Sequence, residues 1–155
     1  MVSITYKKTE LKYGFSDFIS LLHILTILGH KKTAMSSSEI AENANINPVK
    51  VRLILQAMNN NDWIKKSRGR KGGYTLNVDL KDIKCSDLLD VLNLKLINKT
   101  WASGLKDSEC VISRNIEAVE QDLINSLNNV VYENLKNKTL EDIKKEILSK
   151  GGVLC

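Results

Sequence analysis

The side chains with the most reactive chemistry in this sequence are the thiols of Cys85, Cys110 and Cys155. A thiolate is a nucleophile, can be oxidised and binds transition metals. No two of these cysteines have the Cys-x-x-Cys spacing of a zinc or redox site, and the two histidines, His23 and His30, are not placed to complete one. An odd number of cysteines also argues against a disulfide framework. The sequence therefore predicts free thiols and no metal site.

A second chemically distinct group is a cluster of basic side chains around a glycine-rich stretch. Its members are Lys65, Lys66, Arg68, Arg70 and Lys71. The glycines among and after them allow the positive φ angles of a tight hairpin, and residues 63–67 and 74–78 partly alternate as half-buried strands do. The pattern predicts a β-hairpin that presents positive charge to a phosphate backbone or a groove. An ordinary solvated hairpin is the alternative.

Two helices are predicted directly before this hairpin. Serines followed by acidic residues are typical of a helix that begins near Ser38. Asn47 and Pro48 begin the next helix, because asparagine caps a helix and proline suits its first position. The apolar face of that helix comprises Val51, Ile54, Leu55 and Met58. Helix, turn, helix and basic hairpin is the order of a winged helix-turn-helix, whose second helix enters the major groove of DNA.

Polar side chains outside that apolar face are the candidates for DNA contact. Side chains of the second helix are expected on bases or phosphates, the two helix starts on phosphates, and the hairpin on the backbone or in the minor groove. The candidates are Ser38, Asn47, Lys50, Arg52, Gln56, Lys65, Arg68, Arg70 and Lys71.

The distribution of charge agrees with a nucleic-acid-binding amino half. Residues 1–79 carry 12 Lys and Arg against 6 Asp and Glu, whereas residues 80–155 carry 11 against 12. The length of 155 residues favours one compact domain, in which 1–80 form the winged helix-turn-helix and 81–155 the effector connection and dimerisation region. We expect no membrane segment and no export signal, and therefore a cytoplasmic protein with reduced thiols.

The carboxyl half is predicted to be helical. Ser86 is expected to cap a short helix, and Thr139 to begin the last one. Between them, a helix from about Ile112 to Lys136 has apolar residues every three or four positions: Ile112, Ile116, Val119, Leu123, Leu127 and Val130. An apolar face this long in a small chain usually packs on a second copy, so a homodimer is predicted. The expected fold class is mainly α with a small β wing and a long dimerisation helix.

The motifs Ser37-Ser38-Glu39-Ile40-Ala41-Glu42, Asn47-Pro48 and Arg68-Gly69-x-x-Gly72-Gly73-Tyr74-x-Leu76 resemble those of the Rrf2 family of bacterial winged-helix transcription regulators. The resemblance extends over essentially the whole chain. It departs at Asp62, where the family commonly has glycine. The resemblance implies a homodimer that binds a palindromic operator, usually as a repressor, with effector sensing between the short helix and the long one.

The resemblance also bears on the cysteines. Many family members hold an iron–sulphur cluster on three closely spaced cysteines in that connection, but this chain has only Cys85 and Cys110 there. No cluster or other cofactor is therefore expected. The segment from Cys110 to Ile116 is similar to a cluster-free branch in which this cysteine senses oxidants. Its place before a helix start would favour the thiolate. Cys85 and Cys155 are further candidates, as disulfide partners of Cys110 or as unreactive residues.

Two other interpretations stay open. The regulator could respond to a small-molecule ligand and keep its cysteines for structure, or the winged helix could serve only protein contacts, as the exposed-face positions of Val49 and Leu53 suggest. An enzyme is not expected. No Cys and His are arranged for nucleophilic attack, and no glycine-rich phosphate loop precedes a helix.

Overall fold

The computed structural model describes residues 13–99 and 101–152. In chain order its helices and strands are α1 (Phe15–Lys31), α2 (Ser37–Ala44), α3 (Pro48–Ala57), β1 (Ile64–Ser67), β2 (Gly73–Leu76), the 3-10 helix η1 (Leu80–Asp82), α4 (Cys85–Val91), α5 (Val111–Lys136) and α6 (Leu140–Ser149). The predicted class, mainly α with a small two-stranded sheet, is confirmed. Cys155 lies outside the described residues.

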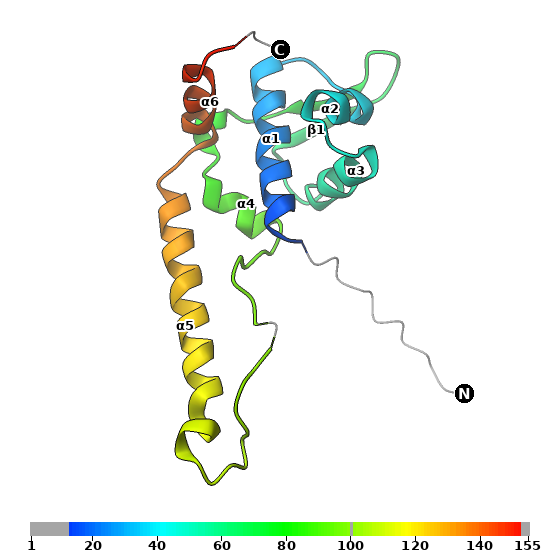
Figure 1. The fold of residues 1–155 in the computed structure, drawn as a ribbon. Helices are drawn as coiled ribbons and strands as arrows, with labels where there is room; N and C mark the ends of the chain where they lie inside the picture. Colours follow the sequence, from blue (N-terminus) through cyan, green and yellow to red (C-terminus); the bar gives the residue numbers. More distant parts are fainter. Residues whose placement is uncertain (1–12, 100, 153–155) are drawn as a thin grey trace, which may run out of the picture.

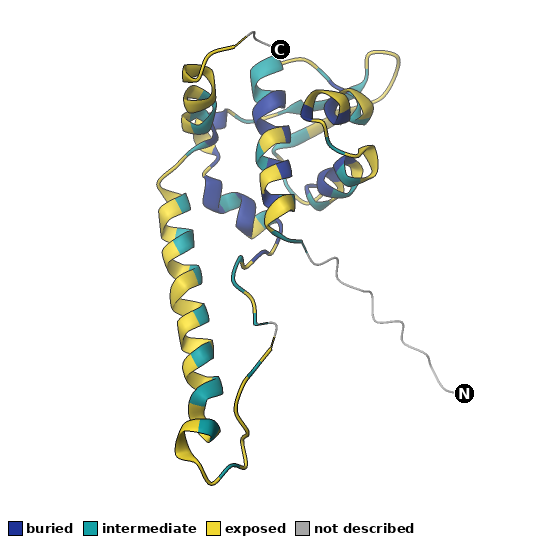
Figure 2. Cartoon of the chain, in the orientation of Figure 1, coloured by how far each residue is buried: buried dark blue, intermediate teal, exposed yellow. Residues whose placement is uncertain are grey.

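Helix α1 runs through the centre of the molecule (Figure 1). Its residues Leu21, Ile24 and Leu25 are fully buried. Helices α2 and α3 and the wing lie on one side of α1, whereas α5 and α6 lie on the other. Figure 2 shows that the buried residues concentrate around α1, α2, α3 and α4, and that α5 is mostly exposed. The hydrophobic core therefore joins the two halves of the sequence around one helix.

The helix-turn-helix has the caps that its sequence requires. Helix α2 begins after Ser36, whose hydroxyl accepts from the N–H of Glu39 at 3.2 Å while the Glu39 carboxylate accepts from the N–H of Ser36 at 2.7 Å. The helix begins at Ser37, one residue before the predicted start near Ser38. Asn47 caps α3 as predicted, since its side-chain oxygen accepts from the N–H of Val49 at 2.8 Å.

The wing is an antiparallel hairpin in which Ile64 pairs with Leu76 and Ser67 with Gly73. The alternating stretches 63–67 and 74–78 predicted strands of five residues, whereas β1 and β2 have four residues each. A bridge between the wing and residue Met35 was not predicted from the sequence. Met35, before α2, exchanges hydrogen bonds with Tyr74 at 3.0 and 2.8 Å. This bridge ties the wing to the helix-turn-helix.

Helix α4 begins one residue before the predicted cap. Its first residue is Cys85, and the N–H of Lys84 donates to the Asp87 carboxylate at 2.8 Å. Ser86 is therefore not the cap. It lies inside the helix with 1% of its surface exposed. The start of α4 is stabilised by the carboxylate of Asp87, the third helical residue, and not by a serine hydroxyl.

A long connection, described over residues 92–99 and 101–110, follows α4 and runs beside α5 to its far end (Figure 1). The side chain of Asn128 on α5 holds this connection, because its oxygen accepts from the N–H of Ile97 at 3.0 Å and its amide donates to the carbonyl of Ile97 at 2.8 Å. Glu117 pairs with Lys99 at 2.6 Å and with Lys106 at 3.4 Å. The connection is therefore attached to α5 at several points along its length.

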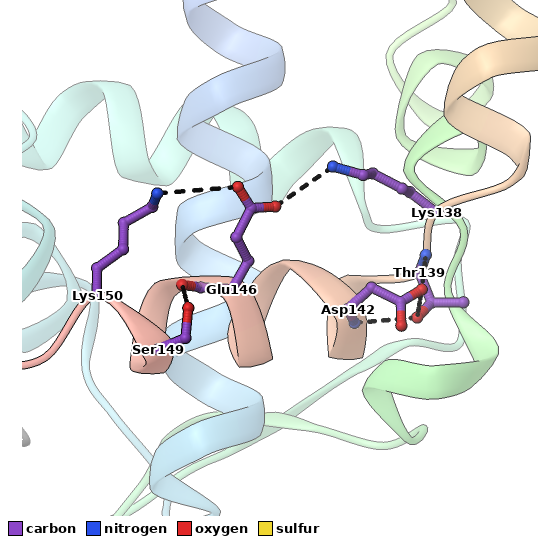
Figure 3. Close-up of polar contacts among 6 residues, drawn as sticks. All are labelled: Lys138, Thr139, Asp142, Glu146, Ser149 and Lys150. Carbon is purple, nitrogen blue, oxygen red and sulfur yellow. Dashed lines mark hydrogen bonds and ion pairs between the residues drawn. The ribbon is translucent and has the colours of Figure 1, made fainter.

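Helix α6 returns the chain to α1. Thr139 begins it as predicted, with its hydroxyl and the Asp142 carboxylate satisfying each other's N–H groups. Leu140 is fully buried in the core. On the outer face, Glu146 lies between Lys138 at 3.3 Å and Lys150 at 4.0 Å (Figure 3). The carboxyl-terminal region therefore packs on the amino half, and a division near residue 80 stays a prediction.

Candidate nucleic-acid interface and thiol sites

The exposed face of α3 carries the side chains that can reach a major groove. Arg52 and Gln56 are exposed, and Val49 is 55% exposed. The opposite face, with Val51, Ile54 and Leu55, is buried. The helix is thus fixed in the core by its apolar residues and presents a polar face with one apolar side chain, an arrangement that can hydrogen-bond to base edges.

Lys50 differs from its neighbours because it has a partner within the chain. Its Nζ lies 3.4 Å from Oδ1 of Asp17 and 3.2 Å from the hydroxyl of Ser16, both at the start of α1. The sequence predicted Lys50 as a DNA contact, and no local pattern links it to Asp17. Its amine is held beside α1, so DNA would have to compete with a carboxylate for it.

The helix starts offer different groups to a phosphate. Asn47 uses its side-chain oxygen to cap α3, which leaves its amide nitrogen as the donor. Ser38 is exposed in the first turn of α2. Ser36 and Glu39, which form the actual cap, were missed as a pair, although their spacing was readable in the sequence.

The basic side chains of the wing are exposed. Lys65, Arg68, Arg70 and Lys71 all point their charges into solvent from the hairpin. The turn closes through the N–H of Gly72, which donates to the carbonyl of Gly69 at 2.9 Å. Lys66 instead covers the ring of Tyr74, with its amine 5.4 Å from the ring centre. In Figure 1 the wing extends beyond α2 on the same side of α1 as α3.

The two described cysteines lie at opposite ends of α5. The N–H of Cys85 donates to the carbonyl of Lys138 at 2.8 Å, just after α5 ends, whereas Cys110 caps the start of this 26-residue helix. A helix of that length spans about 39 Å. A disulfide between Cys85 and Cys110 of one chain is therefore excluded, because the Cα atoms of a disulfide lie within about 7 Å.

The two thiols also differ in reactivity. The nearby backbone N–H groups of Ser113 and Ile112, at the start of α5, lower the pKa of the Cys110 thiol, which is exposed. Burial raises the pKa of Cys85, whose surface is 1% exposed. Cys110 thus has the features of a reactive thiol and Cys85 those of a core residue.

These features define a winged helix-turn-helix protein with a long carboxyl-terminal helix. The profile of the Rrf2 family, described as an iron-dependent transcriptional regulator, matches residues 16–146. The chain therefore belongs to the Rrf2 family of transcription regulators and is not an enzyme.

Similar proteins agree with this assignment. The curated relative YffB, a candidate HTH-type transcriptional regulator of Lactococcus lactis, is 24% identical over 84% of this chain and 88% of its own. A solved candidate transcriptional regulator of Lactobacillus plantarum has a TM-score of 0.75 at 24% identity, over 84% of this chain and 89% of its own. CymR, named the global cysteine regulator of B. subtilis, has a TM-score of 0.62 at 24% identity, over 88% and 98%.

The family description mentions iron, but the described residues do not fit an iron site. No group of three or more His, Cys, Asp or Glu within 13–99 and 101–152 is placed to hold a metal ion. The two cysteines there are separated by the length of α5. An iron–sulphur cluster takes about four ligands around a compact core, and one chain does not offer them in this region. In the same part of the chain, no helix is long and apolar enough to cross a membrane.

Proposed function

We propose that the chain acts as a cytoplasmic homodimer that binds a palindromic operator in double-stranded DNA and represses transcription. The observation that carries this proposal is that the wing, whose lysine and arginine side chains are exposed, lies on the same side of α1 as α3, whose Arg52 and Gln56 are exposed. A groove-binding helix beside a basic hairpin matches the way winged helices contact DNA. The proposed contacts are Ser38, Asn47, Lys50, Arg52, Gln56, Lys65, Arg68, Arg70 and Lys71.

The apolar face of α5 supports the dimer. No residue of α5 is buried, and Val119, Leu123 and Leu127 are at least half exposed. A different face of the same helix, with Ile124, Val131 and Leu135, is half-buried against the chain itself. The exposed face is therefore a separate surface, and a second α5 of the same composition would cover it. The two copies of α3 in the dimer would then enter successive major grooves roughly 34 Å apart.

Cys110 is the proposed switch. Hypochlorite oxidises a thiolate to sulfenic acid, and the sulfenic acid condenses with a small thiol to give a mixed disulfide and water. The exposure of Cys110 and the lowered pKa of its thiol favour the first step. Because Cys110 caps α5, a bulky adduct there would disturb the start of the helix that we expect at the dimer interface. Cys155 stays a candidate resolving thiol, and we assign Cys85 to the core.

Fluorescence anisotropy tests the proposal. The protein would be titrated onto its own promoter fragment and onto scrambled DNA, with reductant and after mild hypochlorite treatment. We expect specific binding that oxidation abolishes and reductant restores, and that Cys110→Ser makes insensitive to oxidant. Specific binding indifferent to redox state would favour a ligand-switched regulator with structural cysteines.

The wing provides an independent test of DNA contact. Arg68→Ala should weaken binding to many sequences alike if it contacts phosphate, and should alter sequence preference if it contacts bases. Unchanged binding would remove Arg68 from the interface. If no DNA were bound at all, the exposed Val49 would favour a winged helix used for protein contacts.

A further inference from the structure

A basic cavity lies between the end of α1, the base of the wing and α6. Its volume is about 590 Å³, within the range of small-molecule sites. Lys32 lines it from the end of α1, Thr75 and Leu76 from β2, Lys81 from η1, and Lys144 and Lys145 from α6. In Figure 1, α6 lies beside the upper part of α1, opposite the tip of the wing.

Positive charge exceeds negative charge in this cavity. Four lysines line it against two acids, Asp79 and Glu141. Each acid already has a lysine: Asp79 pairs with Lys81 at 3.6 Å, and Glu141 with Lys144 at 3.6 Å. Among the described residues, Lys32 and Lys145 have no ion-pair partner. Lys32 at the end of α1 and Lys145 on α6 therefore bring positive charge to the cavity from two elements, although Lys145 also helps to lower the pKa of Asp142.

The backbone conformation of Lys32 is a second, independent observation. Lys32 ends α1 in the left-handed region, with φ of 56° and ψ of 17°. Glycine is the usual residue there, and a lysine at such an angle costs about 1 kcal/mol or more. The other described non-glycine residues with positive φ, Asn45 and Asn93, belong to the type that tolerates this region. The strained position directs a lysine to the cavity where a glycine would be more stable.

The floor of the cavity depends on close packing between α1 and η1. A Cβ atom added to Gly29 would lie 2.5 Å from Cγ of Leu80, so only glycine permits this approach. Leu80 is buried, and Leu28, Gly29 and Leu80 all line the cavity. The cavity is thus built on packed core residues, with the lysines around an apolar base.

We propose that this cavity binds a small polyanion, a molecule with two or three negative charges on phosphate or carboxylate groups. Lys32 and Lys145 would each contact it through their amines. The ligand would join α6 to the end of α1 and to β2. Because β2 is part of the wing, the bound ligand would change DNA affinity, and this effect rests on the proposed function. The binding of the ligand to the cavity does not depend on that function.

Calorimetric titration with inorganic pyrophosphate, at ionic strength matched with sodium chloride, tests the site. We expect saturable binding with one pyrophosphate per chain. The variant Lys32→Gln/Lys145→Gln should weaken it by about tenfold or more, since two charge-assisted contacts are lost. Glutamine removes the charge, is one atom shorter than lysine and keeps a non-glycine residue at the strained position 32. The matched control is Lys138→Gln/Lys150→Gln, which removes the two charges that flank Glu146 (Figure 3). Neither lysine lines the cavity, so this variant should bind pyrophosphate as the parent does.

Two results would overturn the proposal. One is the absence of saturable binding, and the other is an equal loss in both variants, which would indicate attraction by net charge alone. The DNA affinity of the same variants, measured without pyrophosphate, distinguishes a site for a small polyanion from a site for the phosphates of the DNA backbone. If Lys32→Gln/Lys145→Gln weakened DNA binding and no pyrophosphate bound, these lysines would serve the DNA backbone. If pyrophosphate bound to a chain that bound no DNA, the site would stand and the proposed regulator function would fail.

Discussion

Lys50 on α3 and Asp17 in the first turn of α1 form an ion pair, with Nζ 3.4 Å from Oδ1. Asp17 also accepts from the N–H of Gly14 at 2.7 Å and so caps α1. The ion pair links the helix that we expect in the major groove to the central helix of the fold. It also places a negative charge beside a side chain proposed to contact DNA.

Replacing Asp17 with asparagine should strengthen DNA binding. Asparagine can still accept from Gly14, so the cap is retained, but it no longer competes with phosphate for the Lys50 amine. We expect affinity to rise several-fold at low salt, and the slope of log affinity against log salt to steepen by about one. Because both partners are partly exposed, stability should change by less than about 1 kcal/mol. Anisotropy titrations over a salt series measure both quantities.

Asp122→Asn is the control for net charge. Asp122 lies on the exposed part of α5, on the other side of α1 from α3, and its loss changes total charge equally. Its affinity and salt slope should match those of the parent. An equal rise in both variants would show that Lys50 is not in contact with DNA.

Gly73→Ala should destabilise the protein through the bridge between the wing and Met35. A Cβ at position 73 would lie 2.5 Å from the carbonyl oxygen of Met35, which is backbone and cannot rotate away. We expect a loss of about 1–3 kcal/mol in the free energy of unfolding, as for overpacked sites. Urea denaturation followed by circular dichroism measures it. Ser67→Ala, opposite Gly73 in the hairpin register, should stay within about 0.5 kcal/mol of the parent. Equal stability of all three proteins would contradict the proposed clash.

Local sequence patterns were sufficient to predict the helix-turn-helix region of the fold. The apolar spacing of Val51, Ile54 and Leu55 predicted the buried face of α3, and Asn47-Pro48 predicted its start. These features depend on neighbours within one or two turns. The prediction that Ser86 caps α4 was wrong. Both Ser86 and Asp87 are residue types found at helix starts, and here the Asp87 carboxylate accepts from the N–H of Lys84.

Contacts between distant segments were not predictable in this way. The Met35–Tyr74 bridge, the Asp17–Lys50 pair and the hold of Asn128 on Ile97 join residues that no sequence period connects. The same holds for the basic cavity, because Lys32 and Lys145 line one cavity only when α6 packs on α1. The periodicity of a single sequence predicts which residues face the core, but it does not predict which distant residues they contact.

Leu127→Glu should disrupt the proposed dimer. Leu127 is 50% exposed in the single chain, so a charge there costs little in the monomer but would be buried between two copies of α5. We expect sedimentation velocity to show a monomer, and operator affinity to fall strongly because two half-sites are no longer bound together. Asn125→Glu places the same charge on a polar position of α5 and should stay dimeric. A parent chain that sediments as a monomer would refute the dimer itself.

Cys110 should react with iodoacetamide at lower pH than an ordinary cysteine, and Cys85 should not react until the chain unfolds. The backbone N–H groups of Ser113 and Ile112 stabilise the thiolate of Cys110 and lower its pKa, so the midpoint of its alkylation rate should fall below that of the urea-unfolded chain. Since the folded pKa is the lower one, this stabilisation is present above the unfolded pKa and disappears as pH falls through the folded pKa. Burial has the opposite effect on Cys85, whose raised pKa and hidden sulfur both slow alkylation. Mass spectrometry of peptides alkylated over a pH series distinguishes the two sites. A folded chain in which both cysteines react at the same rate would remove the basis for assigning the switch to Cys110.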